Sequence, residues 1–157
     1  MARLLAMRGI TKFFPGVKAL DHVDIDLDRG EILAIIGENG AGKSTLVKVL
    51  GGIYAPEAGR IYLNGAEARV DSVQTATRLG ISFVHQELNL SDNLDIAANV
   101  FLGREPRDKS FLRLIDRKKL YRDTEELLKR IDMHYSPKLL VRDLTIGSQQ
   151  MIEIAKA

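Results

Sequence analysis

Gly37-Glu38-Asn39-Gly40-Ala41-Gly42-Lys43-Ser44-Thr45 is the stretch that decides the fold of this chain. It matches the pattern G-x-x-x-x-G-K-[ST], in which glycines let the backbone curl so that successive N–H groups point at one anion. An apolar run at 32–36 precedes it, and an apolar helical pattern at 46–53 follows it. Strand, glycine loop and helix form the context in which this pattern binds phosphate, so the stretch predicts a phosphate site.

Three side chains of this stretch have a chemical role in such a site. Lys43 would reach the outer phosphates as a point charge. The hydroxyl of Ser44 would bind Mg²⁺, and Thr45 could contact an inner phosphate. The competing interpretation is a glycine-rich turn that carries a solvated lysine, and the flanking strand and helix patterns argue against it.

The composition is that of a globular protein. The chain has 157 residues, of which 45% are hydrophobic and 28% charged, and its net charge is +2. That charge is too small to indicate nucleic acid or a membrane surface as a partner. The chain has no cysteine, which excludes disulfides and thiolate metal sites. Neither a signal peptide nor a transmembrane segment is recognisable, so a cytosolic protein, or one held at a membrane by a partner, is expected.

Two kinds of strand pattern surround the glycine loop. In residues 3–28, apolar side chains such as Val23, Ile25 and Leu27 alternate with aspartates, which predicts an antiparallel sheet with one wet face. Residues 31–36 are apolar without alternation, which favours a strand buried on both faces of a parallel sheet. At the end of the first predicted strand, Phe13 and Phe14 precede a Pro-Gly turn and either stack on a flat ligand such as adenine or belong to the core.

Residues 51–87 predict a helix end, a hairpin, a short helix and a strand. Gly51-Gly52 ends the first helix, Asn64-Gly65 indicates a hairpin, and 72–79 reads as a helix capped by Asp71 or Ser72. Residues 81–84 read as a second buried strand, which would bring Gln86 to the ligand-binding edge of the sheet. Gln86 could bond a ligand of Mg²⁺ or an attacking water, or it is an ordinary polar strand end.

The remainder of the chain, from residue 88, looks helical. Leu120, Thr124, Leu127, Leu128 and Ile131 form one stripe after a candidate cap at Asp116, and residues 104–109 form a charged break between helices. A further helix opens with Leu144-Thr145-Ile146-Gly147. Two interpretations are open for this stretch. The Thr145 hydroxyl, the Gly147 backbone and the helix N-terminus form a second anion site, or the stretch is simply a capped helix start.

Read together, these stretches resemble a known family. The chain resembles the ATPase subunits of ABC transporters in the order of four features. These are a phosphate loop, a strand that ends in glutamine about 40 residues later, a helical insert, and Leu-Thr-x-Gly before a helix. The resemblance covers essentially the whole chain. Three stretches look more specifically like the ribose/galactose/xylose-type importers of bacteria: residues 14–20, 101–106 and 145–157.

The resemblance implies ATP and Mg²⁺ as cofactors and assigns residues to them. Gly37 to Thr45 match the Walker A loop, with Lys43 acting in catalysis and Ser44 on the metal, and Phe14 matches the adenine-stacking aromatic. Gln86 matches the glutamine that acts in catalysis, binds the metal and couples the γ-phosphate to the membrane subunit. Thr145 and Gly147 match signature residues that face ATP held by an opposite domain. Here Ile146 replaces a glycine, as is common in the sugar-importer group, and Ser148 replaces a glutamine. The change at Ser148 is expected to weaken the second phosphate contact.

The implied fold is α/β, a P-loop NTPase of the ABC type. The expected parts are an antiparallel β layer at 1–30, a P-loop core at 31–87, a helical subdomain at 88–147 and the start of the signature helix at 148–157. In this family the Walker B strand and the switch histidine follow the signature helix, beyond Ala157. The chain is therefore expected to bind nucleotide, to hydrolyse it poorly, and to carry unpaired strand edges that promote self-association.

The implied function is that of an ATPase that powers import of a sugar, expected to be a monosaccharide, across the bacterial inner membrane. The implied partners are a second nucleotide-binding domain in head-to-tail contact, membrane permease subunits and, indirectly, an extracytoplasmic sugar-binding protein, with no nucleic acid. The chain would then lie peripherally on the cytoplasmic face. The alternative is a non-transport ABC ATPase acting on ribosomes or in DNA repair, although the compact, mixed-charge insert at 88–142 speaks against the long arms of that class.

Overall fold

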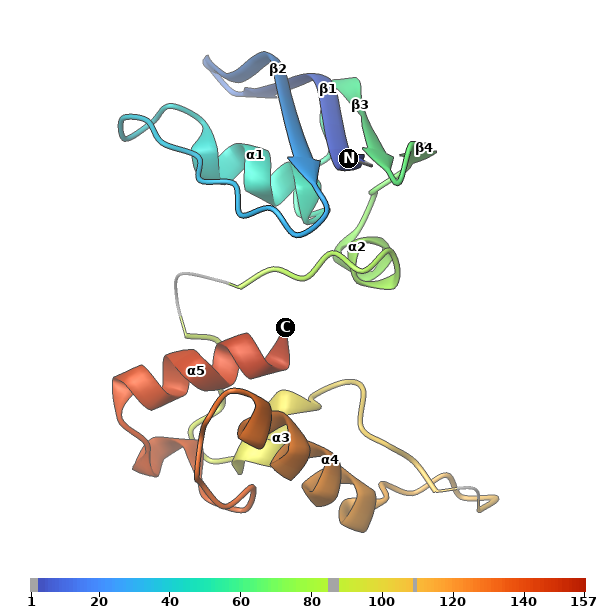
Figure 1. Cartoon of the computed structure of the whole chain (residues 1–157), viewed down its shortest axis with the longest axis vertical. Coiled ribbons are helices and arrows are strands. Elements are labelled where there is room, and N and C mark those ends of the chain that lie inside the picture. Colours follow the sequence, from blue (N-terminus) through green and yellow to red (C-terminus); the bar gives the residue numbers. More distant parts are fainter. Residues whose placement is uncertain (1–2, 85–87, 109) are drawn as a thin grey trace. The chain divides into compact units, whose positions relative to one another are not determined.

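The chain forms two compact units, each with its own hydrophobic core. The structure, a computed structural model, describes residues 3–84, 88–108 and 110–157. Unit 1 is Met1–Ser82 and unit 2 is Phe83–Ala157. Unit 1 combines an antiparallel sheet with helices, and unit 2 is helical (Figure 1). No helix in the described ranges is long and apolar enough to cross a bilayer.

The sheet of unit 1 has four antiparallel strands in the order β2-β1-β3-β4. The strands are β1 (Arg3–Phe14), β2 (Val17–Asp28), β3 (Ala58–Leu63) and β4 (Ala66–Ala68). Asn64 and Gly65 join β3 to β4 with φ angles of 52° and 81°, the pair of positive values that a type I′ hairpin requires. The predicted antiparallel layer and hairpin are both confirmed.

Helix α1 (Lys43–Leu50) packs its apolar side on this sheet. Val49 of the helix and Met7 and Ile10 of β1 are completely buried there. Helix α2 (Val73–Arg78) begins at Ser72, whose hydroxyl accepts a hydrogen bond from the Thr75 amide at 3.1 Å, so Ser72 is the cap. Burial of one helical stripe against a sheet face is the arrangement that the 3.6-residue period predicts.

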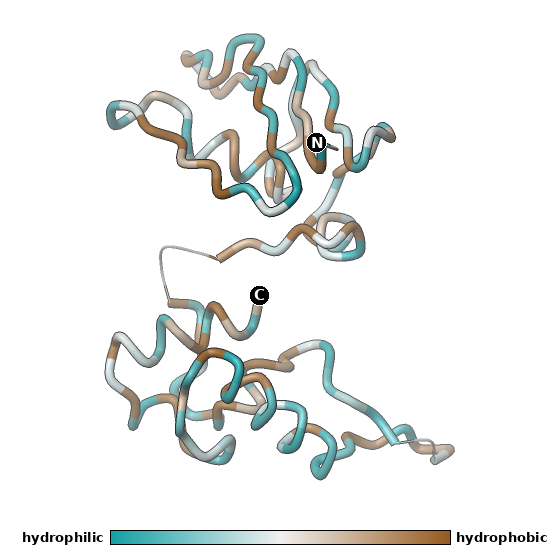
Figure 2. The backbone as a smooth tube through the Cα atoms, viewed as in Figure 1, coloured by the Kyte–Doolittle hydropathy of each residue, from teal (hydrophilic) through white to brown (hydrophobic). Residues whose placement is uncertain are grey.

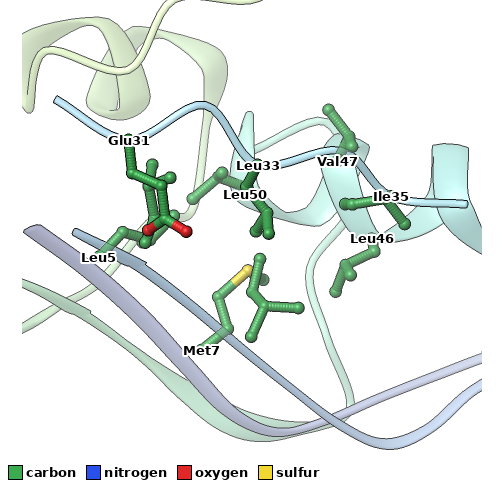
Figure 3. A pocket seen from close by; sticks show the side chains of 10 residues that line it. Leu5, Met7, Glu31, Leu33, Ile35, Leu46, Val47 and Leu50 are labelled. Carbon is green, nitrogen blue, oxygen red and sulfur yellow. The ribbon is translucent and has the colours of Figure 1, made fainter. Parts of the chain in front are cut away.

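The prediction of a buried strand at 31–36 is wrong for this structure. The segment forms no strand, and Ile32 and Ile36 are 96% and 92% exposed. Leu33 and Ile35 turn inward instead and line an apolar cavity of about 200 Å³ between the segment, α1 and the sheet (Figure 3). A strand needs a neighbour for its hydrogen bonds, and in the described part of unit 1 none lies beside this segment, which Figure 2 shows as an apolar stretch leading to α1.

The second predicted buried strand, at 81–84, is not formed either. Ile81 packs partly against the core of unit 1, while Val84 is 45% exposed. Both strand predictions are wrong for the same reason. A continuous apolar run indicates burial, but it does not show whether partner strands are present to form the sheet. His85, Gln86 and Glu87 lie outside the described residues.

Unit 2 is less helical than predicted for 88–142. It contains α3 (Ile96–Val100), α4 (Arg117–Arg130), a 3₁₀ turn (Val141–Asp143) and α5 (Ile146–Lys156), and the expected charged break separates α3 from α4. Asp116 caps α4, and the predicted stripe faces inward. The core is made by residues of all three helices and of the loops between them: Ile96, Val100, Leu128, Met133, Val141, Leu144 and Ile152.

Candidate functional site

The glycine loop before α1 forms a tight turn. Gly40 and Gly42 have φ angles of 87° and 85°, in the left-handed region that glycine adopts without steric cost. The amide of Ala41 donates to the carbonyl of Glu38 at 3.2 Å and closes a tight turn between them. Residues 37–41 are all exposed, so a ligand can reach the backbone of the loop.

The start of α1 differs from the start of every other α-helix in the described ranges. Gly42 is its N-cap and provides no side-chain acceptor. The other four α-helices are each capped by a side-chain oxygen, from Ser72, Asp95, Asp116 and Thr145. The first N–H groups of α1 therefore lack the side-chain acceptor that the other four helices have. Such an uncapped helix start suits a bound anion.

Packing fixes Gly42 in this position. A Cβ atom at residue 42 would lie 2.4 Å from the backbone oxygen of Ala19 and 2.9 Å from Cδ2 of Leu20, both in β2. Only glycine permits this approach, and it anchors the end of the loop to the sheet. The loop is thus held at its helical end by the rigid part of unit 1.

Lys43 lies across the loop that precedes it. Its Nζ donates to the carbonyl oxygens of Gly37 and Glu38, both at 2.7 Å. These neutral acceptors hold the ammonium group beside the open N–H groups without neutralising its charge. A phosphate oxygen, which carries negative charge, is a stronger partner for the ammonium than a carbonyl.

Ser44 and Thr45 follow on the first turn of α1. Ser44 is exposed and its hydroxyl makes no hydrogen bond within the part of the chain that the structure describes, and Thr45 is half-buried. No group of three or more His, Asp or Glu side chains in the described ranges could hold a metal by itself. A hydroxyl beside a phosphate site suits Mg²⁺, which keeps several waters and uses phosphate oxygens as ligands.

The two aromatic residues at the end of β1 have different surroundings. Phe14 is half-buried. It packs against Tyr54 in a T-shaped arrangement with a centroid distance of 5.2 Å, and Lys12 Nζ lies 5.5 Å from its ring. Phe13 is 47% exposed, with Lys18 Nζ 5.6 Å from its ring. Neither ring is a fully buried core residue. Tyr54 lies 40 residues from Phe14 in the sequence, and no local pattern identifies it.

A carboxylate holds the end of β1 in place. Glu57 accepts hydrogen bonds from Lys12 Nζ and from the Phe13 amide, both at 2.8 Å. The hydrogen bond from Lys12, followed by that from the Phe13 backbone, lowers the pKa of Glu57. Charge and hydrogen bonding thus fix the backbone beside the two rings, a contact absent from the sequence predictions because it joins segments 44 residues apart.

The start of α5 is closed by hydroxyl groups. Thr145 Oγ1 accepts from the Ser148 amide at 3.2 Å and lies 2.9 Å from Ser148 Oγ. Tyr135 Oη lies 3.0 Å from the same Ser148 oxygen. Gly147 has nothing within 4 Å of where a Cβ would be, and these residues line an open hollow of about 730 Å³. Tyr135 is a further residue that the sequence analysis did not identify.

The predicted site residues are divided between the two units. The loop Gly37–Thr45 and Phe14 belong to unit 1, whereas Thr145 and Gly147 belong to unit 2. Gln86 lies outside the described residues. The roles of all these residues in ligand binding remain predictions.

Comparison with known proteins identifies the family. The family model described as ABC transporter matches residues 20–157. The chain is 54% identical over 154 residues to the ribose import ATP-binding protein RbsA 2 of Streptomyces coelicolor, with 98% of this chain and 29% of that protein covered. It is 53% identical to the galactose/methyl galactoside import ATP-binding protein MglA 1 of Photobacterium profundum, with 98% and 31% covered. The chain thus spans about 30% of the length of these relatives.

Solved structures show the same fold. A nucleotide-free ATP-binding cassette from an ABC transporter matches 99% of this chain and 64% of its own, with a TM-score of 0.84 and 24% identity. A dimeric ATP-binding cassette in a post-hydrolysis state with ADP and phosphate matches 98% of this chain and 68% of its own, with a TM-score of 0.74 and 23% identity. The expected ABC-type fold is confirmed. The chain belongs to the ABC transporter family.

Proposed function

We propose that this chain binds Mg·ATP through Gly37–Thr45 and forms part of an ATPase that powers sugar import. The observation that carries the proposal is the start of α1, which has no side-chain cap and has Lys43 Nζ fixed beside it. Unpaired N–H groups, a helix dipole and an ammonium group in one place form a site for a polyphosphate.

The chemistry follows from the donors in the loop. The backbone N–H groups would hold the phosphates, Lys43 would contact their outer oxygens, and Thr45 an inner one. Ser44 and Gln86 would hold Mg²⁺, which neutralises charge on the phosphates. Phe14, which packs against Tyr54 in a T-shaped arrangement with a 76° angle between the rings, would stack against adenine.

A complete site needs a second nucleotide-binding domain in head-to-tail contact. In this arrangement Thr145 and Gly147 would face the γ-phosphate held by the partner domain. The open space around Gly147 allows a phosphate to approach the backbone there, whereas the Thr145 hydroxyl must share its Ser148 contacts. Relatives named as ribose and galactose import ATP-binding proteins support a monosaccharide as the transported substrate. The further partners would be permease subunits and an extracytoplasmic binding protein, with the chain on the cytoplasmic face of the inner membrane.

The alternative is a non-transport ABC ATPase acting on ribosomes or in DNA repair. In the described part of unit 2 the longest helix, α4, has 14 residues, so this insert provides no long coiled-coil arm. The transport function is therefore favoured over this alternative.

Calorimetry with Mg·ATP tests the proposal on the chain itself. We expect micromolar binding that weakens by about 10- to 100-fold in Lys43→Ala, because charge-assisted contacts of this kind contribute about 1.5–3 kcal/mol. Lys48→Ala is the matched control, since Lys48 lies one turn further along the same helix, over Tyr54. Equal binding by wild type and Lys43→Ala, or none by either, would contradict the proposal. Uptake of labelled ribose and galactose, compared with and without the gene, tests the transport part.

A further inference from the structure

A buried carboxylate near the end of α5 binds a distant part of unit 2. Glu153 is 6% exposed and is the one buried charged side chain in the described ranges. Its Oε1 accepts a hydrogen bond from the backbone amide of Asn89 at 2.7 Å. A buried carboxylate without a hydrogen-bond partner is costly, so loss of this bond would destabilise this part of unit 2.

Lys156 completes the attachment from the next turn of the same helix. Its Nζ donates to the carbonyl of Asn89 at 3.2 Å and lies 4.0 Å from Oε1 of Glu153. Both backbone polar groups of Asn89 are thus bonded to side chains of α5. The arrangement specifies one backbone position, because donor and acceptor must both be satisfied at once.

A second buried side chain holds the same segment two residues further on. Asn99 of α3 is 1% exposed, accepts from the Ser91 amide at 2.7 Å and donates to the Ser91 carbonyl at 3.1 Å. Arg104 also joins α3 to α5, because its guanidinium donates to the carbonyls of Val100 and Lys156. The segment from Asn89 to Ser91 is therefore fixed to two helices through bonds to its backbone.

We propose that Glu153 is a positioning residue that joins α5 to the segment following Gln86, so that the two move as one body. Asn89 is three residues after Gln86, and Glu153 lies on the helix that begins at the Thr145 cap. The eight residue steps from Thr145 to Glu153 cover about 12 Å of helix. A displacement of Thr145 and Gly147 would be transmitted along α5 to Asn89.

This inference rests on the proposed function, in which Gln86 responds to the γ-phosphate of one ATP and Thr145 to that of another. With Glu153 in place, a movement of Thr145 toward the γ-phosphate of one ATP would shift the segment that follows Gln86, which responds to the other ATP. Without it, the two responses would lose their mechanical connection although each residue remained present.

Hydrogen exchange of the Asn89 amide in the 157-residue chain is the first test. Glu153→Ala removes the acceptor, and we expect exchange at Asn89 to rise by about 10- to 100-fold, the factor for losing a charge-assisted hydrogen bond. Glu153→Gln retains a carbonyl acceptor and should restore most of the protection. Glu126→Ala, which removes an exposed glutamate of α4, is the control and should leave Asn89 unchanged.

Spin labels test whether α5 and the segment move together. Because the chain has no cysteine, labels can be placed at Leu88→Cys and Ile146→Cys, two exposed positions of unit 2. The distance distribution between them should be narrow in wild type and Glu153→Gln and broader in Glu153→Ala. Lys156→Met, which keeps the apolar stem but removes the second bond, should broaden it less, and it serves as the test if Glu153→Ala does not fold.

The outcomes separate this inference from the proposed function. Unchanged exchange and distances in Glu153→Ala, or exchange that rises equally over all of unit 2, would overturn the positioning role. A lack of Mg·ATP binding by the wild-type chain would overturn the proposed function and leave the exchange result standing. In Glu153→Ala we expect ATP affinity to stay unchanged, since the phosphate loop belongs to unit 1.

Discussion

Helices α1 and α5 both follow a loop, yet only α5 has a side-chain N-cap. The first N–H groups of α1 follow a glycine and receive no side-chain acceptor, whereas those of α5 are closed by Thr145 and Ser148. An uncapped start leaves its first N–H groups without a side-chain acceptor, and we propose that in α1 they bind a ligand. A capped start contributes to the stability of its own unit.

The core of unit 2 and the apolar run 32–36 of unit 1 differ in how far their apolar side chains are exposed. In the core of unit 2, Ile96, Val141 and Ile152 are completely buried. In unit 1 the apolar run 32–36 lies on the surface, with only Leu33 and Ile35 directed inward (Figure 3). Substitutions in the two segments should therefore have very unequal effects on the free energy of unfolding.

Leu128→Ala should show the largest effect. Leu128 is 1% exposed in the core of unit 2, so its truncation should reduce the free energy of unfolding by about 2–5 kcal/mol. Ile36→Asn is the matched change in unit 1 and should cost no more than about 0.5 kcal/mol, because Ile36 is 92% exposed. Urea denaturation of both variants measures the contrast. Comparable losses would mean that residues 32–36 are buried in solution.

Two glycines sharpen the comparison between α1 and α5. Gly42→Ala should destabilise unit 1 by about 2–4 kcal/mol and abolish nucleotide binding, since it combines a positive φ with a clash against Ala19. Gly147→Ala meets no atom within 4 Å and lies inside α5, so it should stabilise unit 2 by about 0.5–1 kcal/mol. Thermal melting, with calorimetry for ATP, distinguishes them. The comparison fails if both substitutions act alike.

Removing the cap of α5 should have a moderate effect. Thr145→Ala deletes the acceptor for the Ser148 amide and should cost about 1 kcal/mol, whereas Thr145→Ser keeps the oxygen and should be nearly neutral. ATP affinity of the chain should not change in either variant. Denaturation curves and calorimetry provide the measurements, and a loss of ATP binding in Thr145→Ala would show that the starts of α1 and α5 are not separate in function.

The smallest effect concerns pH and the end of β1. The pKa of Glu57 is lowered below its ordinary value of 4.5, chiefly by Lys12, so its contacts are present above that value and are lost as the pH falls through the lowered pKa. Amide exchange at Phe13, corrected for its intrinsic pH dependence, should accelerate below pH 4.5. Glu57→Gln keeps an acceptor without a titrating group and should abolish this transition. A pH-independent Phe13 amide in wild type would disprove the role of Glu57.

Local signals in the sequence were sufficient for the elements that depend on neighbours in the chain. Asn64-Gly65, Ser72 and Asp116 each determine their turn or cap within four residues, and the structure confirms them. The glycine loop was found for the same reason, since its pattern is contiguous.

The failures all depend on distant partners. The apolar run at 32–36 predicted burial, but burial of a strand requires neighbours that an isolated stretch does not contain. Tyr54 beside Phe14, Tyr135 beside Ser148 and Glu153 beside Asn89 are contacts between residues 13 to 64 positions apart. No spacing rule predicts such pairs, because they arise only when the chain is folded.

The two carbonyl bonds of Lys43 have a consequence for the thermodynamics of binding. The ammonium group already has its place at the loop, so an incoming phosphate exchanges one set of partners for another instead of ordering a free side chain. Most of the entropy of fixing the lysine is lost during folding of unit 1 rather than on association. Binding should then resemble insertion into a preformed receptor, with its selectivity determined by the difference between a neutral and a charged oxygen.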